Sequence, residues 1–242
     1  MTPPNKSSRA SSSWAGKPPP TRGPKPSLSR VQIARAAIHL ADKEGLAAVT
    51  MQRVAREVGR TTMALYRYFP SKAAVIALMI DSVADSSVHC GKASLLWSTR
   101  LKEWAHSCLA LYQDHPWFLE ATTARETPIG PNELAWMEAA LAMLAESGLE
   151  PKKRHHAFFA LIGHIRGHAT FQQARRSNAT GKKWMRELTQ LMRQESDRYP
   201  ILLNVLRSGP FGESVAGAFD FGLDCILVGI RAQISATTAR LT

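Results

Sequence analysis

Hydroxyl, amide and cationic side chains are concentrated between Thr50 and Lys72, and groups of these types can bind a polyanion. The segment carries five Lys and Arg against one acidic residue, Glu57. Hydroxyls and amides can hydrogen-bond base edges, and cationic groups can hold phosphates. The first 72 residues hold 13 Lys and Arg and three acids, against 18 and 16 in the rest. Such a charge pattern predicts a polyanionic partner, either nucleic acid or an acidic membrane surface.

Two short helices across a glycine turn are predicted to hold these side chains. Thr50 is an N-cap residue type, and Gly59 is expected to end the helix that it begins. Thr61 is the next N-cap candidate, and the run from Thr61 to Phe69 carries Leu65 as its inward anchor. Two short helices joined in this way predict a helix-turn-helix.

A longer helix on each side completes a small helical domain. The stretch Ser29-Arg30-Val31-Gln32 is a capping box, so a helix is predicted to begin there and to end at Gly45. Pro70-Ser71 stops the third helix and caps a fourth, which has Lys72 on its first turn. The basic end of the chain is therefore predicted to be an all-α domain.

The stretch from Thr50 to Lys72 closely resembles the DNA-binding domain of the tetracycline-repressor (TetR) family. The threonine that opens the second helix, the glycine turn and the Leu-Tyr-x-Tyr-Phe-x-x-Lys ending of the third helix carry the resemblance. It implies a helix-turn-helix DNA-binding domain over residues 29–82, with double-stranded DNA as the partner.

The second helix of such a pair lies in the major groove with its N-terminal residues toward the base edges. Thr61, Thr62 and Ala64 are the base-facing candidates, through hydroxyls and through contact with thymine methyls. Gln52 and Arg60 can make bidentate contacts to adenine and guanine respectively.

The remaining candidate contacts are expected to hold phosphates, which position a domain without specifying sequence. Tyr66 and Tyr68 could instead be core aromatics, and Arg56 is left out as a solvated charge. The phosphate candidates are Thr50, Arg53, Tyr66, Arg67, Tyr68 and Lys72.

Residues 1–28 hold seven of the 14 prolines, together with five basic residues and no acid. Such a segment buries too little apolar surface to offset its ordering entropy, so it is predicted to be a disordered basic arm. The arm is either a DNA tether or a solubilising tail.

Residues 83–242 are predicted to form a second helical domain, because Gly and Pro separate amphipathic stretches and no period-two pattern is present. A short helical piece is expected after His115-Pro116. The longer helices are predicted over residues 95–113, 132–146, 152–175, 183–198 and 212–237.

The stretch 218–230, and Gly148-Leu149 before a helix containing Gly163-His164, resemble the C-terminal domain of the same family. The resemblance implies an effector-binding and dimerisation domain, in which helices 152–175 and 212–237 pair with their symmetry mates as a homodimer. Gly163 and Gly167 independently indicate a flat helix face that allows close approach. Two reading helices one DNA turn apart would fit a palindromic operator.

The same resemblance implies an effector pocket enclosed by the middle helices. Thr123 stands near the place of the histidine that takes the tetracycline-bound metal, which argues for a different effector, small and largely apolar. Each candidate could equally be solid core. The candidates are Trp104, Cys108, Thr123, Trp136, Met137 and Ala140.

These observations favour a ligand-responsive transcriptional regulator, with a repressor as the usual case in the family. The alternatives are an effector-independent dimeric DNA-binding protein and a metal-dependent enzyme that uses His164 and His168, whose i, i+4 spacing can chelate a metal. No GxSxG, HExxH or P-loop motif occurs, so we expect no enzyme, no cofactor and no metal.

The location is predicted to be cytoplasmic, without a membrane partner. The three cysteines, Cys90, Cys108 and Cys225, have no paired spacing and are expected to be reduced thiols. No apolar run approaches the 18 or more residues of a membrane span, and no signal peptide is predicted.

Overall fold

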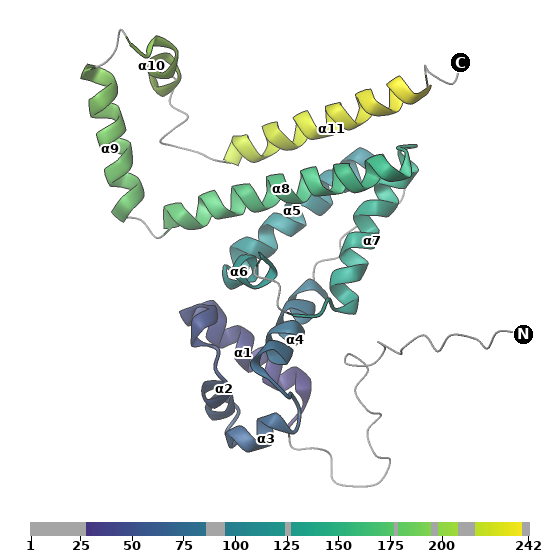
Figure 1. The fold of residues 1–242 in the computed structure, drawn as a ribbon, viewed down its shortest axis with the longest axis vertical. Helices are drawn as coiled ribbons and strands as arrows, with labels where there is room; N and C mark the ends of the chain where they lie inside the picture. Colours follow the sequence, from purple (N-terminus) through teal and green to yellow (C-terminus); the bar gives the residue numbers. More distant parts are fainter. Residues whose placement is uncertain are drawn as a thin grey trace, which may run out of the picture. The chain divides into compact units, whose positions relative to one another are not determined.

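The computed structural model describes residues 28–85, 95–123, 127–176, 179–194, 198–207 and 216–238. All regular structure in these ranges is helical, which confirms the predicted all-α class (Figure 1). Nearly all of the predicted basic arm, residues 1–27, lies outside the described residues.

The described residues fall into two compact units. The first unit contains residues 28–85 and 127–135, and the second contains residues 95–123 and those from 136 onward. One helix, α7 (Pro131–Glu146), contributes its first residues to the first unit and the remainder to the second.

The first unit is a bundle of short helices built on α1 (Arg30–Glu44), which packs against the helix before the glycine turn and against the long helix that follows the turn. The helix after the glycine turn packs against the one before it. Its core contains buried apolar side chains that include Ile33, Leu65, Phe69 and Met79. The other elements are η1 (Leu46–Ala48), α2 (Met51–Glu57), α3 (Thr62–Tyr66) and α4 (Lys72–Asp85).

Side-chain caps begin these helices where the sequence predicts them. Ser29 and Gln32 form the reciprocal capping box of α1. The Thr50 hydroxyl accepts from the Arg53 amide at 3.2 Å, and the Ser71 hydroxyl accepts from the Ala74 amide at 3.2 Å. Each cap satisfies an amide that has no partner within its own helix, which fixes where the helix starts.

Asp81 on α4 caps the N-terminus of α7 within the first unit. Its carboxylate accepts from the backbone amides of Asn132 at 2.8 Å and Glu133 at 3.3 Å, and it is buried. Gly130 permits this approach, because a Cβ at that position would lie 2.1 Å from the Asp81 carboxylate oxygen. A carboxylate at a helix N-terminus also interacts favourably with the helix dipole.

The second unit is centred on α8 (Pro151–Arg176), which packs against α5, α6 and α11. Its core includes Leu101, Leu144, Leu161 and Leu223, each fully buried. The remaining helices are α5 (Trp97–Asp114), α6 (Trp117–Thr123), α9 (Ala179–Gln194), α10 (Pro200–Arg207) and α11 (Ala216–Thr238).

Helix bounds in the second unit agree with the predicted ranges to within a few residues, but α10 was not predicted. It begins at Pro200, a residue that fits the first turn of a helix because it needs no amide partner there. Across the described ranges, no helix combines the length and the apolar character needed to cross a bilayer.

Candidate nucleic-acid interface and buried aromatic cluster

The turn between α2 and α3 depends on Gly59, whose φ of 64° lies in the left-handed region. The Arg60 amide then donates to the Ala55 carbonyl at 2.9 Å, which closes the turn on the end of α2. The Thr61 hydroxyl accepts from the Ala64 amide at 3.3 Å and starts α3. These contacts hold the first turn of α3 in a fixed direction relative to α2.

One side of α3 is anchored in the core and the other is open. Leu65 and Phe69 are fully buried, and the Arg30 guanidinium lies over the Phe69 ring at 4.6 Å from its centroid. Thr61 is exposed on the first turn, and Thr62 and Ala64 are partly exposed. The three predicted base-facing residues therefore all retain accessible surface.

The two tyrosines differ in exposure. Tyr66 is 46% exposed and Tyr68 is half-buried, so Tyr66 is not a core aromatic. Gln52, Arg60, Arg67 and Lys72 are all exposed. Long side chains placed in this way can reach a phosphate or a base edge without disturbing the bundle.

Arg53 has a partner within the chain. Its guanidinium donates to the Glu44 carboxylate at 2.7 Å, and both groups are open to solvent. This hydrogen bond holds the pKa of Glu44 below its ordinary value. A phosphate that binds Arg53 has to compete with that carboxylate.

Three aromatic side chains from α5, α7 and α8 pack together in the second unit. The ring centroids of Trp104 and Trp136 are 5.5 Å apart, and those of Trp104 and Phe158 are 6.2 Å apart. Cys108 is one turn along α5 and is completely buried, and burial raises the pKa of its thiol. We call Trp104, Trp136 and Phe158 the aromatic cluster.

The indole N–H groups of Trp104 and Trp136 are buried and have no hydrogen-bond acceptor among the residues that the structure describes. Leaving a buried donor unpaired costs about 1–3 kcal/mol. The aromatic cluster therefore consists of apolar ring faces and two indole N–H groups without a hydrogen-bond partner in the described part of the chain.

The other predicted effector contacts are distributed differently. Ala140 is fully buried and Met137 is half-buried, whereas Thr123 is exposed and its hydroxyl donates to the Leu119 carbonyl at 2.7 Å. The neighbouring Thr122 is the buried threonine, and its hydroxyl donates to the Phe118 carbonyl.

His164 and His168, the alternative metal ligands, are both occupied by contacts within the chain. His164 Nε2 lies 2.9 Å from the Phe219 carbonyl oxygen, and its ring stacks on the Phe219 ring. His168 Nε2 lies 3.0 Å from the Gln172 side-chain nitrogen. Burial lowers the pKa of His168, and the charge of His164 lowers it further.

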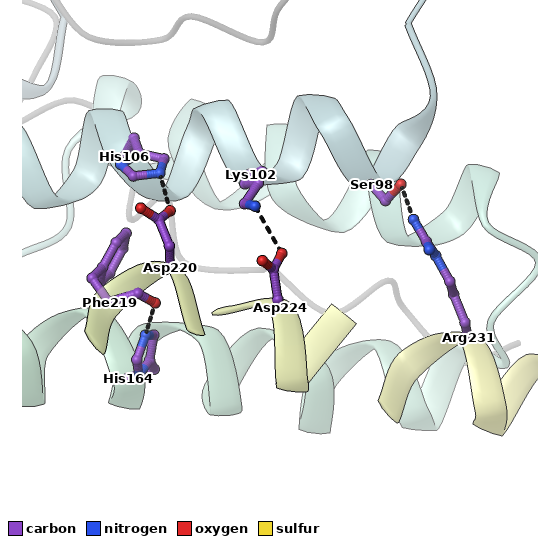
Figure 2. A network of polar contacts seen from close by, with 8 residues as sticks. All are labelled: Ser98, Lys102, His106, His164, Phe219, Asp220, Asp224 and Arg231. Atoms are coloured by element: carbon purple, nitrogen blue, oxygen red, sulfur yellow. Dashed lines mark hydrogen bonds and ion pairs between the residues drawn. The ribbon is translucent and has the colours of Figure 1, made fainter. Parts of the chain in front are cut away.

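A row of polar contacts joins α5 to α11 (Figure 2). Asp220 pairs with His106 at 2.8 Å and Asp224 pairs with Lys102 at 2.8 Å. Arg231 donates to the Ser98 hydroxyl at 2.8 Å. From one contact to the next, the residue number of the α5 partner rises while that of its α11 partner falls. The two helices therefore run antiparallel.

Helices α8 and α11 also expose apolar side chains to solvent. Phe221 is 74% exposed and Val228 is 62% exposed on α11, and Phe159 and Phe171 are similarly exposed on α8. Exposed glycines lie along the same helices, among them Gly163 and Gly167. We call this surface the α8–α11 face.

Residues 33–79 match the family described as bacterial regulatory proteins, tetR family, and residues 94–234 match the tetracyclin repressor-like C-terminal domain. The chain belongs to the tetR family. It is therefore a DNA-binding transcriptional regulator with an N-terminal helix-turn-helix and a C-terminal helical domain, as predicted.

Individual relatives of this tetR-family chain come from Streptomyces. HTH-type transcriptional repressor DrrR1 of Streptomyces coeruleorubidus is 34% identical over 226 residues, which cover 89% of this chain and 82% of that protein. Apo ActR from Streptomyces coelicolor has a TM-score of 0.76 at 23% identity, covering 87% of this chain and 98% of that one. ActR in complex with actinorhodin has a TM-score of 0.75 at 23% identity, over 86% and 98%.

Two residues next to the candidate sites of this tetR-family regulator were not predicted from the sequence. Met63 is 75% exposed on the first turn of α3, next to the predicted base contacts. Phe158 joins the aromatic cluster, although its helix was assigned to dimerisation alone. The signal for Phe158 was the spacing Phe158, Leu161, Ile165, which marks an inward face of α8.

Proposed function

We propose that this chain is a dimeric repressor that binds a palindromic operator and releases it when a small, largely apolar molecule binds the second unit. The α8–α11 face carries this proposal. Large apolar side chains exposed along two packed helices mark an interaction site, and a second copy of the chain offers the same surface.

A dimer also fits the size of the reading element. The single helix α3 has five residues, so one chain can read only a few base pairs. A two-fold dimer reads two half-sites about 34 Å apart, which gives a palindromic operator. Thr61, Thr62 and Ala64, with Gln52 and Arg60, would read bases, and the exposed cationic and tyrosine side chains would hold phosphates.

The aromatic cluster supports the effector part of the proposal. Large rings from three helices are the lining expected of a site for an apolar molecule. ActR, a fold relative, has been solved with actinorhodin bound. An effector that favours a DNA-incompetent state lowers operator affinity by the ratio of its affinities for the two states.

A selection experiment tests the DNA-binding part. The full chain is incubated with a random pool of double-stranded DNA at about 0.15 M salt, a concentration that screens exposed charges strongly. We expect enrichment of inverted repeats with half-site centres about 10 base pairs apart. If no inverted repeat is bound in preference to random DNA, the proposal fails.

Two variants separate base reading from phosphate binding. Thr62→Val removes a hydroxyl but keeps the shape of the side chain, and it should change the preferred base at one position. Arg67→Ala should weaken binding to operator and to random DNA to a similar extent. The salt dependence of binding should fall by the amount expected for about one lost phosphate contact. Identical effects of the two variants would contradict these roles.

A further inference from the structure

The second unit holds two buried hydrogen-bond donors, Trp104 Nε1 and Trp136 Nε1, that no acceptor meets in the part of the chain that the structure describes. Trp104 is 0% exposed and Trp136 is 8% exposed, so bulk water does not reach either group. Proteins pair nearly all such groups, and each exception needs an explanation, such as a water, an ion or a ligand.

The two donors belong to neighbouring indole rings. The rings are in contact at a centroid separation of 5.5 Å, and they come from separate helices, α5 and α7. Phe158 of α8 adds a third aromatic surface beside Trp104. An indole N–H can only donate, so each of the two buried groups requires an acceptor.

A shared water explains the pair less well than a ligand does. A buried water generally makes about three hydrogen bonds. It could accept from both indoles, but its own protons would then need acceptors, and the Phe158 ring beside Trp104 offers no oxygen or nitrogen. A molecule whose polar atoms only accept satisfies both indoles without adding unpaired donors.

We propose that the indole N–H groups of Trp104 and Trp136 are the polar contacts of the effector, and that the effector is a flat aromatic carbonyl compound. Its ring faces pack against the aromatic cluster, and its carbonyl oxygens accept from the two indoles. This inference rests on the proposed function, since it assumes that the second unit binds an effector. Trp104 and Trp136 are buried in this structure, so entry of an effector requires movement of side chains.

Two matched probes test the acceptor requirement. Anthraquinone-2-sulfonate and anthracene-2-sulfonate share a flat three-ring skeleton and one sulfonate, and only the former has carbonyl acceptors. Binding to the full chain is measured by titration calorimetry for wild type, Trp104→Phe and Trp136→Phe. These substitutions remove the N–H groups and keep an aromatic ring. Trp117→Phe is the control, because Trp117 is also buried but is outside the cluster.

Wild type should bind the quinone more tightly than the hydrocarbon. Each cluster variant should weaken quinone binding by about 2- to 12-fold, the range of one net hydrogen bond, and should leave hydrocarbon binding within about two-fold. Trp117→Phe should change neither. Equal losses for both probes, no loss in either cluster variant, or no preference of wild type for the quinone would overturn the inference.

A second measurement does not depend on how the variants fold. In proton–nitrogen correlation spectra of the wild-type chain, the quinone should move two indole proton resonances to the higher frequency expected of a new N–H hydrogen bond, and the hydrocarbon, which has no acceptor, should not. If all indole resonances respond alike to the two probes, the donor pair is not the contact. Operator binding without a probe is scored separately: its absence would refute the proposed function, whereas intact operator binding without a quinone preference would refute only this inference.

Discussion

At the residue scale, the ion pair between Arg53 and Glu44 sets how available one cation is to DNA. The pair is solvent-exposed, and such pairs add little stability, so its main effect is competition with phosphate. Glu44→Gln removes the competing charge. We expect it to tighten binding to operator and random DNA alike by about two- to five-fold.

Glu57→Gln is the matched control for this change, because it removes one acidic charge from α2 without breaking the hydrogen bond to Arg53. Fluorescence anisotropy of labelled DNA over a salt series measures both variants. Glu44→Gln should steepen the salt dependence by up to one phosphate, and Glu57→Gln should do so less. Equal effects would mean that only net charge matters.

His168 makes stability depend on pH. Gln113 donates to the Gln172 side-chain oxygen, and the Gln172 amide nitrogen donates to His168 Nε2, which therefore acts as an acceptor. Burial lowers the pKa of His168 in the folded state, and His164 contributes in the same direction. His106 on α5 is the titratable group that faces Phe219 from the other side.

The sign of the pH effect follows from this lowered pKa. Above the unfolded value of about 6.5, His168 is neutral in both states and its contribution to stability is complete. As the pH falls below 6.5 toward the folded pKa, the unfolded chain binds the proton more readily and stability is lost. Denaturant unfolding at pH 7.5 and 5.5 should show a smaller drop for His168→Gln than for wild type. His156→Gln, at an exposed position of the same helix, should retain the wild-type drop.

At the element scale, the packing of α11 on α8 depends on Gly222. A Cβ at this position would lie 2.3 Å from His164 Cε1. The His164 ring cannot move aside easily, because it stacks on the Phe219 ring and its Nε2 is hydrogen-bonded to the Phe219 carbonyl oxygen. We expect Gly222→Ala to lower the free energy of unfolding by about 1–3 kcal/mol, the usual cost of overpacking.

Gly217→Ala supplies the comparison, since a Cβ there meets no atom within 4 Å. Its thermal unfolding midpoint should stay at or slightly above that of wild type, because alanine is the better helix former. Calorimetry of both variants distinguishes a steric effect from a general intolerance of α11 to substitution. Equal thermal unfolding midpoints for the two variants would show that the His164 side chain moves aside at little cost.

Helices of this chain could be predicted where their ends have a local chemical cause. Ser29, Thr50, Thr61 and Ser71 cap helices through their own side chains. The first residue of each of these helices can therefore be predicted from neighbouring residues in the sequence. Helix α10 was not predicted: it begins at Pro200, which suits the first turn of a helix but does not by itself indicate one.

The sites show the same division between local and distant causes. The exposed face of α3 follows from helical periodicity around Leu65 and could be predicted. The contact between Trp104 and Trp136 could not, because it depends on how α5 and α7 pack. The absence of an acceptor for either indole among the described residues is a property of three-dimensional packing and has no sequence signal.

At the scale of the whole molecule, the net charge and the most exposed aromatic side chains of the described residues belong to different parts of the chain. The excess of basic residues belongs to the end that carries the helix-turn-helix, and the exposed Phe side chains of the described residues belong to α8 and α11. Charge at the reading end supplies attraction to any DNA, so selectivity for one operator must come from the few groups on α3 and from pairing of two copies.

The last prediction concerns that pairing. Val228→Asp places a charge at the centre of the exposed face of α11, where a second copy would bury it. We expect the variant to sediment as a monomer and to lose about 10²-fold or more in operator affinity, because two half-sites on one DNA no longer act together. Binding to random DNA at low salt should fall much less, since each chain retains its own cations.

Leu134→Asp is the control for adding one negative charge at an exposed leucine, here 52% exposed on α7 and part of the first unit. It should remain dimeric and should bind the operator nearly as wild type does. A dimeric Val228→Asp variant with full operator affinity would refute the α8–α11 face as the dimer interface. A monomeric variant with full affinity would instead refute the need for two reading helices.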